Sequence, residues 1–445
     1  MTIDPSWISG SGLGSADAFL TGRPPVKGCR VALLGFDGVG QAVVRNLCER
    51  RNAGIRLAQI YNAEGSPRPS WIPTEIAWTT DPRTIDLSDF DIVVDLAGDQ
   101  DRSREWIRSA LEAGKSVVTA SKHVMARHGP DLLALARARG CQLRFEAVVG
   151  GSVPMVSGLR DGLAGDRLRS LVGILTGADN YILTRIEWTG GTFEEAVAEA
   201  QRLGLIGDNP ADDVEGHDAA AKLSVICGIA FGRQIVFEEV PRQSMAAIEA
   251  IDFQYAARLD CTIRPIAYAE RRSGGLSAWV GPALVPRASM LAHLHGSQNL
   301  LITTGEATTR TGFFGVGAGS RAIAVAVVSD LLALVSDGPR HPSRMPVPTR
   351  AHVVTAETDI RRYVRFVVHD RPGIIAELAA AFAAERIGIE SVLQEPTLRR
   401  NELVFVMTLD PCPQPALDRA VVAIEACDFH IRPPLALRML DPAVG

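Results

Sequence analysis

Five carboxylates lie just ahead of one lysine in the segment from Leu203 to Lys222; they are Asp208, Asp212, Asp213, Glu215 and Asp218. From about Asp218 the chain reads DAAAKLSVICGIA, which is typical of a helix. Asp218 and Lys222 then lie one turn apart on the same helix face, where side chains at i and i+4 meet. A lysine whose pKa is set by burial and by neighbouring carboxylates can exchange a proton with a hydroxyl group.

A simpler structural role fits the same residues. Acidic side chains are favoured at a helix start by the helix dipole, and Asp218 with Lys222 can form an ordinary surface ion pair. The residues after Lys222 favour burial, because the apolar side chains recur at helical spacing; they are Leu223, Val225, Ile226 and Ile229. We therefore expect the pair to lie against a hydrophobic core.

A second chemical pattern lies between the apolar run 30–34 and the helical residues QAVVRNLCERR. A strand, a glycine turn and a helix form the context of a dinucleotide-binding fingerprint, and the free N–H groups of the helix start can bind a pyrophosphate. The expected cofactor contacts are Gly35, Phe36, Gly38, Val39 and Gly40. Asp37 stands where the pattern needs its second glycine, so a tight strand–helix turn without a ligand is the alternative.

The apolar segments 55–61, 91–98 and 116–119 alternate with helical patterns, which predicts a doubly wound α/β domain over residues 29–150. Ser121 and Lys122 follow the last of these strands. The carboxyl ends of the strands are where open α/β sheets bind ligands. A surface lysine at a helix start is the alternative for Lys122.

Composition bounds the class of protein. The 445 residues exceed one ordinary domain, so two or three domains are expected. A net charge of −5 without a long basic run argues against a nucleic-acid partner. Seven dispersed cysteines without a CxxC pair argue against a disulfide framework and a zinc site. Residues 1–28 lack the features of a signal peptide, and no apolar stretch is long enough for a bilayer; we expect a cytoplasmic protein with a disordered extension and no membrane partner.

The segment DDVEGHDAAAKL, residues 212–223, resembles the signature of the homoserine dehydrogenases. These NAD(P)-dependent enzymes link L-aspartate 4-semialdehyde and L-homoserine. The resemblance implies that Asp218 orients the substrate and that Lys222 is the proton donor and acceptor. It also implies substrate contacts for Asp208, Asp212 and Asp213. The family places a glutamate that holds the substrate ammonium group at the position of Gly207, so we expect the adjacent Asp208 to take that role.

Further segments extend the resemblance. Thr119-Ala120-Ser121-Lys122 is similar to the family's Thr-Ala-Asn-Lys, which implies that Ser121 and Lys122 contact the cofactor and that Lys122 is a second catalytic lysine. The run FEAVVGGSVP is similar to FEASVAGGIP, a loop that binds sodium through main-chain carbonyls. The implied sodium ligands are Glu146, Val149, Gly151 and Val153. The resemblance also implies cofactor contacts for Gly204 and for Gly317 in GVGAG.

Residues 151–336 are predicted to form an α+β catalytic and dimerisation domain, and the resemblance implies a homo-oligomer. Strand-like segments within it include 255–259 and 277–280. The helix that follows GVGAG is expected to return to the first domain. The segment GADNYIL, which opens a helix at Gly177, is similar to the family's GTTNYIL and departs from it at Ala178 and Asp179.

The C-terminal residues predict a separate small module. DGPRHPSRMPVPTR, with four prolines and no periodicity, predicts a linker over 337–358 that lets the preceding residues fold without the module. The βαββαβ pattern of residues 359–440, with Asp370-Arg371-Pro372-Gly373 between strand and helix, resembles an ACT domain and a ferredoxin-like unit. The resemblance implies an amino-acid effector, threonine first, near Asp370 and Gly373.

The sequence therefore predicts an amino-acid-regulated homoserine dehydrogenase with NADP or NAD as cofactor and a possible sodium ion. Two alternatives stay open at this point. A diverged member that acts on another hydroxy acid is favoured by Gly207. A catalytically weak protein that senses an amino acid is favoured by Asp37.

Overall fold

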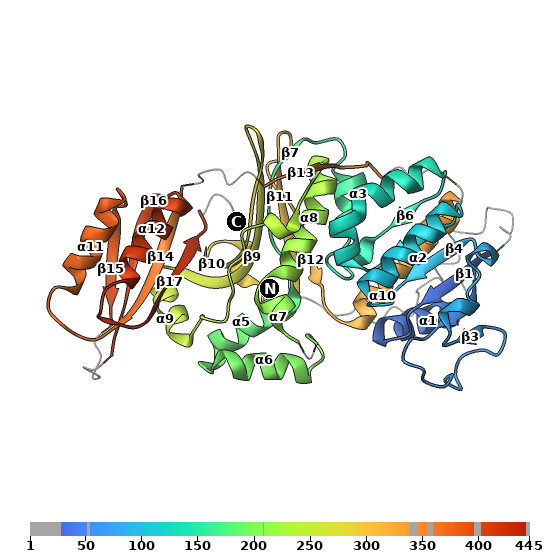
Figure 1. The fold of residues 1–445 in the computed structure, drawn as a ribbon, viewed down its shortest axis with the longest axis horizontal. Helices are drawn as coiled ribbons and strands as arrows, with labels where there is room; N and C mark the ends of the chain where they lie inside the picture. Colours follow the sequence, from blue (N-terminus) through green and yellow to red (C-terminus); the bar gives the residue numbers. More distant parts are fainter. Residues whose placement is uncertain are drawn as a thin grey trace, which may run out of the picture.

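The computed structural model describes residues 28–50, 54–207, 209–338, 341, 345–353, 359–395 and 402–441. The predicted N-terminal extension, apart from its last residue, and Asp208 lie outside these residues. Figure 1 shows three regions in a row along the long axis of the molecule. The region from β1 to β6 lies at one end, and the region from β14 to β17 lies at the other.

The first region is a parallel sheet with the strand order β3-β2-β1-β4-β5-β6. Its strands are β1 (Cys29–Leu34), β2 (Ile55–Tyr61), β3 (Ala77–Thr79), β4 (Ile92–Asp95), β5 (Ser116–Thr119) and β6 (Leu143–Arg144). Its helices are α1 (Gly38–Arg50), α2 (Gln100–Glu112) and α3 (Lys122–Ala138). The doubly wound prediction is confirmed. Helix α10 (Ser320–Asp337) returns to pack beside α1 and β5, as expected (Figure 1).

The second sheet has nine strands in the order β12-β11-β7-β9-β10-β17-β14-β16-β15. Its strands are β7 (Leu168–Ile174), β9 (Cys261–Arg272), β10 (Gly275–Pro286), β11 (Gln298–Gly305), β12 (Thr311–Val316), β14 (Ile360–Val368), β15 (Ile389–Gln394), β16 (Leu403–Cys412) and β17 (His430–Met439). The longer helices around it are α5 (Gly177–Thr189), α6 (Phe193–Arg202), α8 (His217–Phe231), α9 (Ala250–Arg258), α11 (Ile374–Ala384) and α12 (Gln414–Glu425). The βαββαβ order predicted for the C-terminal module is confirmed.

Shorter elements complete the described chain. They are α4 (Met155–Ser157), α7 (Ala211–Val214), the strands β8 (Arg233–Ile235) and β13 (Thr349–Ala351), the 3₁₀ turns Pro82–Thr84, Leu87–Asp89, Glu146–Val148, Phe237–Glu239 and Met290–His293, and the π turn Gly158–Gly162. Among the described residues no helix is both long and apolar enough to cross a membrane.

The prediction of a strand at residues 255–259 is wrong, because Ala250–Arg258 forms helix α9. A capping box starts this helix: Glu249 and Asp252 each accept a hydrogen bond from the other's backbone N–H. Phe253, Tyr255 and Ala256 are buried on its inner face. Aromatic and β-branched residues favour strands, and here tertiary packing of a short capped helix outweighs that preference.

The predicted linker is also more structured than expected. Within its described part, strand β13 pairs in parallel with β8, and Met345 is buried in the core that includes α3 and α8. The C-terminal module is joined to the middle region by β17, which pairs in parallel with β10 through Ala283–Arg438 and Leu284–Met439. The two regions therefore share one hydrogen-bonded sheet, and the expectation that a linker separates them is not met.

A buried polar cluster reinforces this junction. The Asp252 carboxylate on α9 accepts hydrogen bonds from the Tyr363 hydroxyl at 2.7 Å and from the Arg365 guanidinium at 2.9 Å, both on β14. Arg365 also lies 3.2 Å from Glu249. The Tyr255 hydroxyl donates to the carbonyl of Val404 on β16 at 2.9 Å. These contacts hold α9 of the middle region against the C-terminal module.

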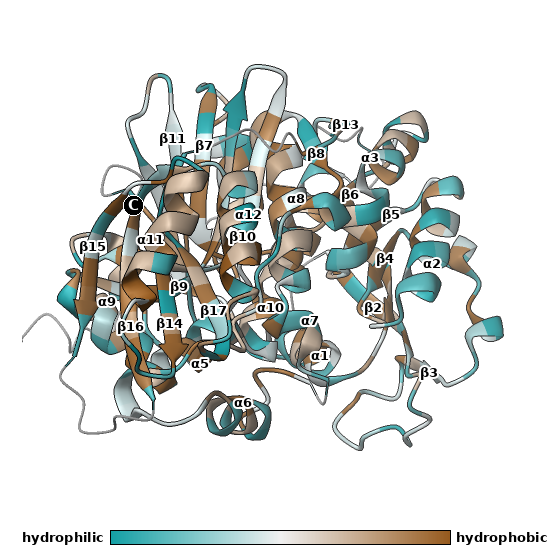
Figure 2. Cartoon of the chain, turned by 60° about the vertical axis from the view of Figure 1, so that its left-hand side comes forward, coloured by the Kyte–Doolittle hydropathy of each residue, from teal (hydrophilic) through white to brown (hydrophobic). Residues whose placement is uncertain are grey.

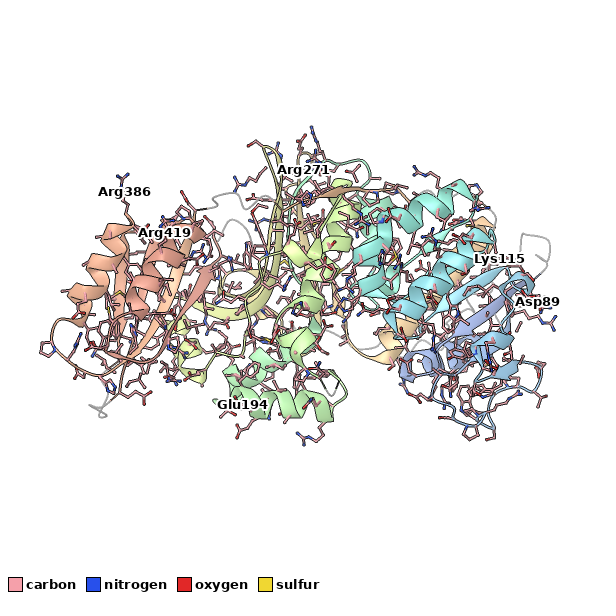
Figure 3. All side chains as sticks on the ribbon, in the orientation of Figure 1. Asp89, Lys115, Glu194, Arg271, Arg386 and Arg419 are labelled. Carbon is pink, nitrogen blue, oxygen red and sulfur yellow. The ribbon has the colours of Figure 1, made fainter. Side chains whose placement is uncertain are left out.

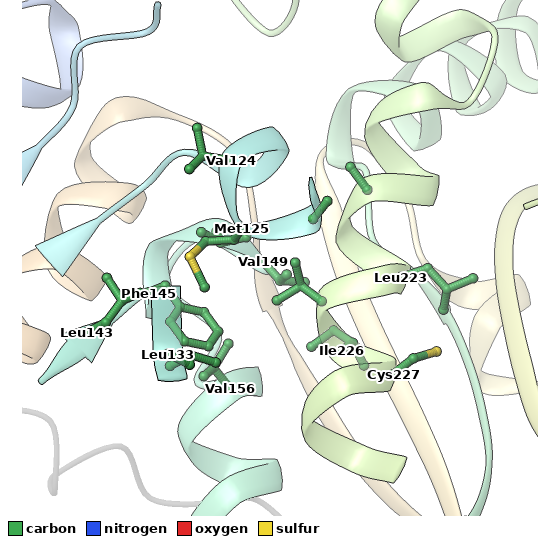
Figure 4. Close-up of a cluster of buried hydrophobic side chains, with 14 of the residues drawn as sticks. Val124, Met125, Leu133, Leu143, Phe145, Val149, Val156, Leu223, Ile226 and Cys227 are labelled. Atoms are coloured by element: carbon green, nitrogen blue, oxygen red, sulfur yellow. The ribbon is translucent and has the colours of Figure 1, made fainter. Parts of the chain in front are cut away.

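Hydrophobic packing between α3 and α8 positions the candidate catalytic residues. Figure 2 shows apolar residues gathered in the strands, with polar residues on the outer face of α2. Figure 4 shows Ile226 of α8 on the side of the helix that faces Met125 and Leu133 of α3, with Leu223 and Cys227 on another side of α8. Charged side chains such as Arg386 and Arg419 lie at the periphery (Figure 3). Because the two helices pack by these residues, their polar ends meet at one place.

Asp252→Ala should lower the free energy of unfolding by about 3 kcal/mol, since breaking a buried ion pair leaves the partner charge uncompensated. Urea unfolding followed by circular dichroism gives the value. Arg419→Ala is the matched control, because its 2.7 Å pair with Glu385 is on the surface, where such pairs contribute about 1 kcal/mol or less. Equal losses in the two variants would show that the buried cluster does not hold the junction.

Candidate active site

Asp218 and Lys222 form a buried ion pair at the start of α8. The Lys222 Nζ lies 2.6 Å from the Asp218 Oδ2, one helical turn away. Asp218 is only 2% exposed, so the pair is not the solvated surface bridge that the sequence left open. Gly216, with φ of +78°, turns the chain between α7 and α8 in a conformation that favours glycine.

Lys122 meets the same carboxylate from α3. Its ammonium group pairs with Oδ1 of Asp218 and lies 3.4 Å from Oδ2 of Asp212. Lys122 is the first residue of α3, directly beyond the carboxyl end of β5. The structure thus brings Lys122, Lys222, Asp212 and Asp218 together, as their predicted roles require.

The main chain supplies a further contact. The Lys222 Nζ donates to the carbonyl of Leu175 at 3.3 Å, and the Asn299 side chain donates to the same oxygen at 3.2 Å. Leu175 follows β7 and leads into α5. His123, which the sequence interpretation missed, lies 3.2 Å from Asp212 through its Nε2. Its position directly after Lys122 was the available signal.

The charges of this group determine its protonation. Burial by itself would raise the pKa of Asp218, but the ammonium groups of Lys222 and Lys122 lower it well below its usual range. Burial would lower the pKa of Lys122, and the Asp218 carboxylate raises it above its usual value. Lys122 is therefore a fixed positive charge. Burial and the neighbouring Asp218 raise the pKa of Asp213 to about 6.

An open cleft of about 310 Å³ runs from these lysines to the carboxyl ends of β4 and β5. Its lining includes the small residues Gly98, Ala120, Ser121, Gly151 and Gly317, together with Val39, Lys122 and Lys222. The strand order reverses between β1 and β4, which is where doubly wound sheets bind dinucleotides. Of the predicted cofactor contacts, Val39, Ser121, Lys122 and Gly317 line the cleft. Gly35, Phe36, Gly38 and Gly40 form the strand–helix turn beside it, and Gly204, past the end of α6, does not line it.

Asp37 occupies the helix start at which a pyrophosphate would bind. Its Oδ1 accepts hydrogen bonds from the backbone N–H groups of Val39 at 3.0 Å and Gly40 at 3.1 Å. These are donors of the first turn of α1. The cleft, which is lined by small residues, fits a nicotinamide dinucleotide. At the helix start where the diphosphate of that dinucleotide would bind, however, the chain already places an anion of its own, the Asp37 carboxylate.

A buried carboxylate that the sequence interpretation missed fixes the wall of the cleft. Asp95, at the end of β4, accepts hydrogen bonds from the hydroxyls of Ser103 on α2 and Thr119 on β5, each at 2.8 Å. Burial raises the pKa of this carboxyl. The network ties two strands and a helix together directly before Leu96, Ala97 and Gly98, which line the cleft. An acidic residue at the end of a buried strand was the available signal.

The loop that contains the predicted sodium ligands is held by buried carboxylates. Glu146 accepts hydrogen bonds from the N–H groups of Val156 and Ser157 at 2.9 and 2.8 Å. Its own N–H donates to Asp330 of α10 at 2.8 Å. Burial raises the pKa of Asp330 to about 7. The loop between these anchors holds Val149, Gly151 and Val153, and Gly150 and Gly151 adopt positive φ angles of 80° and 56°.

The predicted regulatory turn lies far along the chain, between β14 and α11. Gly373 has φ of +100° and precedes the first residue of the helix, and Asp370 is exposed. Arg371 between them pairs with Asp428 at 3.0 Å and Glu377 at 3.0 Å. This turn is at the end of β14 opposite to the end near β10.

Comparison with known proteins places these regions in families. The model described as "Homoserine dehydrogenase, NAD binding domain" matches residues 35–146, and "Homoserine dehydrogenase" matches residues 154–332. "ACT domain" matches residues 362–425. The homoserine dehydrogenase of Corynebacterium glutamicum is 33% identical over 93% of this chain and 96% of its own. That of Mycobacterium tuberculosis is 35% identical over 89% of this chain and 94% of its own.

Solved structures agree. A homoserine dehydrogenase from Thiobacillus denitrificans is 30% identical, covers 93% of this chain and 99% of its own, and superposes with a TM-score of 0.82. A hyperthermophilic archaeal homoserine dehydrogenase in complex with NADPH shares the fold at 22% identity and a TM-score of 0.59. The chain also has a lysine pair on one buried carboxylate beside a dinucleotide-type cleft. From the matches over nearly its whole length, the chain belongs to the homoserine dehydrogenase family, whose members are NAD(P)-dependent oxidoreductases.

Proposed function

We propose that this chain interconverts L-homoserine and L-aspartate 4-semialdehyde. The observation that carries the proposal is the buried Asp218 carboxylate between Lys122 and Lys222 at the mouth of the cleft. This arrangement can bind a hydroxyl group and exchange its proton. The curated relatives with this name match nearly the whole chain, which supports the same reaction.

The chain's residues divide the work. A bound nicotinamide supplies the hydride acceptor when the carbinol C–H bond breaks, and the carbinol becomes an aldehyde. Lys222, in its unprotonated form, accepts the hydroxyl proton, and in the reverse direction it returns that proton to the aldehyde oxygen. Lys122 stays charged and stabilises the developing negative charge on that oxygen. Asp218 orients both amines.

The cofactor proposal covers NAD and NADP. An acidic residue near the end of β2 favours NAD, because it binds the ribose hydroxyls. Glu64 is exposed three residues beyond β2, and its N–H donates to the Asn62 side chain at 3.3 Å. The archaeal complex with NADPH supports NADP as the cofactor. Each nucleotide is therefore a substrate to be assayed.

We also propose a sodium ion on the main-chain carbonyls of Glu146, Val149, Gly151 and Val153. Carbonyl oxygens suit a hard cation, and the loop is anchored through the Glu146 carboxylate and by Asp330. The ion would brace the loop that forms one wall of the cleft; it takes no part in the proton transfer.

Regulation and assembly complete the proposal. An amino-acid effector, threonine first, would bind the ACT domain near Asp370 and Gly373. A homo-oligomer is supported by the edge strand β12, which exposes Phe314 and Val316 at 58% and 53%, because an edge strand can pair with a second chain. The seven cysteines, all described and none in a disulfide, support a reducing cytoplasm.

One second candidate function has a specific observation in its favour. The Asp37 carboxylate uses N–H groups that would bind a diphosphate, which favours a catalytically weak protein that senses amino acids. The deciding experiment is oxidation of reduced nicotinamide by the purified protein with L-aspartate 4-semialdehyde, with each nucleotide in turn. Turnover supports the dehydrogenase; nucleotide-independent threonine binding without any turnover would support the sensor.

Lys222→Ala should lower kcat about 10²–10⁴-fold, which is the usual contribution of a positioned general acid or base. Nucleotide affinity should be nearly unchanged. Lys115→Ala is the matched control, since Lys115 donates only to the carbonyl of Ser88 at the surface among the contacts described. Steady-state rates and calorimetric titration give both quantities. Unaltered turnover in Lys222→Ala would remove the proton-transfer role.

Asp37→Gly should tighten nucleotide binding roughly two- to fivefold, because an anion at a helix start contributes about 0.3–1 kcal/mol and the variant frees that place for the diphosphate. Asp37→Asn keeps the helix cap without the charge and should give an intermediate affinity. Calorimetric titration of the three proteins compares them. Equal or weaker binding by Asp37→Gly would mean that the cap and the diphosphate do not compete.

A further inference from the structure

Asp179 is a buried carboxylate with one unpaired oxygen. It lies in the first turn of α5 and is 3% exposed. Its Oδ2 accepts a hydrogen bond from the Thr176 hydroxyl at 2.6 Å. Its Oδ1 is buried and has no hydrogen-bond partner in the described part of the chain. Because an unpaired buried polar atom costs free energy, this oxygen points to a missing donor.

The surroundings of Asp179 connect it to the catalytic lysines. It lines a small cavity of about 20 Å³ together with Leu175, Thr176 and Asp213. The Leu175 carbonyl on this cavity is the one that accepts the hydrogen bond from Lys222. Asp213 comes from α7, immediately after Asp212, which contacts Lys122. The cavity thus borders the proton-transfer group and shares no lining residue with the dinucleotide-type cleft.

The charges around the cavity are unbalanced. Four carboxylates, those of Asp179, Asp212, Asp213 and Asp218, surround the two ammonium groups of Lys122 and Lys222, with His123 beside Asp212. Burial raises the pKa of Asp179 well above its usual range, and Asp213 and Asp218 raise it further, while Thr176 and Lys222 oppose this. One more compact cation would reduce this excess of negative charge.

We propose that Asp179, with Asp213 beside it, binds the α-ammonium group of the substrate. This inference rests on the proposed function, in which L-homoserine carries that group. An ammonium group offers three donors in a small volume, which suits a cavity with an unpaired carboxylate oxygen. Gly207, where the family resemblance placed the glutamate for this role, is exposed and has no side chain. Asp179 therefore supplies the missing anion from a different element.

Substrate binding then has a defined pH dependence. In an empty site burial favours the protonated form of Asp179, because it raises the pKa of this carboxyl. An ammonium group favours the ionised form, so binding releases a proton and tightens as pH rises through the pKa of the empty site. The groups that face Asp179 are Thr176 on the preceding turn, Asp213 on α7, and Asp218 with Lys222 on α8. Asp213 contributes to the same pH dependence near pH 6. Comparison of the Asp179 variants with the wild type therefore isolates the part that is due to Asp179.

The test compares L-homoserine with 4-hydroxybutyrate, which lacks the amino group. Asp179→Asn should raise the KM for L-homoserine tenfold or more, with kcat within about threefold, and leave the KM for 4-hydroxybutyrate unchanged. The pH dependence of the L-homoserine KM should flatten. Glu194→Gln, an exposed acid on the neighbouring helix α6, is the control. Asp179→Thr, the residue of the similar family segment, should show the same loss, and adding Gly207→Glu to it should restore the L-homoserine KM.

Calorimetric titration of L-homoserine in two buffers of different ionisation enthalpy tests the site without turnover. The wild type should release a proton on binding, and Asp179→Asn should release fewer. An unchanged L-homoserine KM and unchanged proton release in both Asp179 variants would overturn the proposal. An L-homoserine-selective loss in Asp208→Asn instead would also overturn it. Absence of turnover in the wild type, with binding and proton release intact, would contradict the proposed reaction and leave the ammonium site supported.

Discussion

The structure depends on one carboxylate that is buried between two lysines. Asp218 has almost no contact with water, and it is stable as an anion because Lys122 and Lys222 approach its two oxygens from different helices. A buried ion pair contributes little net stability and is costly to break. The fold meets that cost by packing α3 against α8 through apolar side chains, so that the polar ends of the two helices cannot separate independently.

The use of lysine at this place is selective. The chain has four lysines in all, Lys27, Lys115, Lys122 and Lys222, and 46 lysines and arginines together. Two of the four meet at one carboxylate. Arginine keeps its proton in proteins and cannot act as a proton donor or acceptor, whereas a lysine amine can. In a chain that otherwise uses arginine for positive charge, Lys222 stands where the chemistry needs an exchangeable proton, and Lys122 supplies a fixed positive charge beside it.

Local pattern was enough to predict the elements and the pair within one helix. The alternation of strands and helices predicted the parallel sheet, and i,i+4 spacing predicted Asp218 with Lys222. The prediction that Lys122 and Asp218 share one site rested on the family resemblance, because no local rule connects residues 96 positions apart. The helix cap made by Asp37 could have been predicted, since Asp is a common N-cap residue. The glycine-rich pattern favoured a ligand-binding turn instead. Helix α9 was missed because the burial of Tyr255 depends on the C-terminal module, whose Val404 lies 149 positions later in the chain.

Predicted contacts that depend on loop paths were less accurate. Gly204 lies past the end of α6 and not at the cleft, and the orphan oxygen of Asp179 could not be seen before the cavity beside α7 was known. In the segment similar to GTTNYIL, Asp179 is a departure to which the sequence pattern assigns no role. Burial gives it one, since a carboxylate without enough partners is informative only when its surroundings are known.

The shared sheet has a consequence for the order of synthesis. Strand β17 follows every other described strand in the sequence, yet it lies in the interior of the nine-strand sheet, between β10 and β14. Domains form during translation as their residues emerge. Here the ladder between the catalytic and ACT regions cannot close until β17 has left the ribosome, and until then β10 and β14 each present an open edge. A nascent chain of this protein therefore carries two unpaired strand edges that a chaperone, or a neighbouring nascent chain, can reach before β17 covers them.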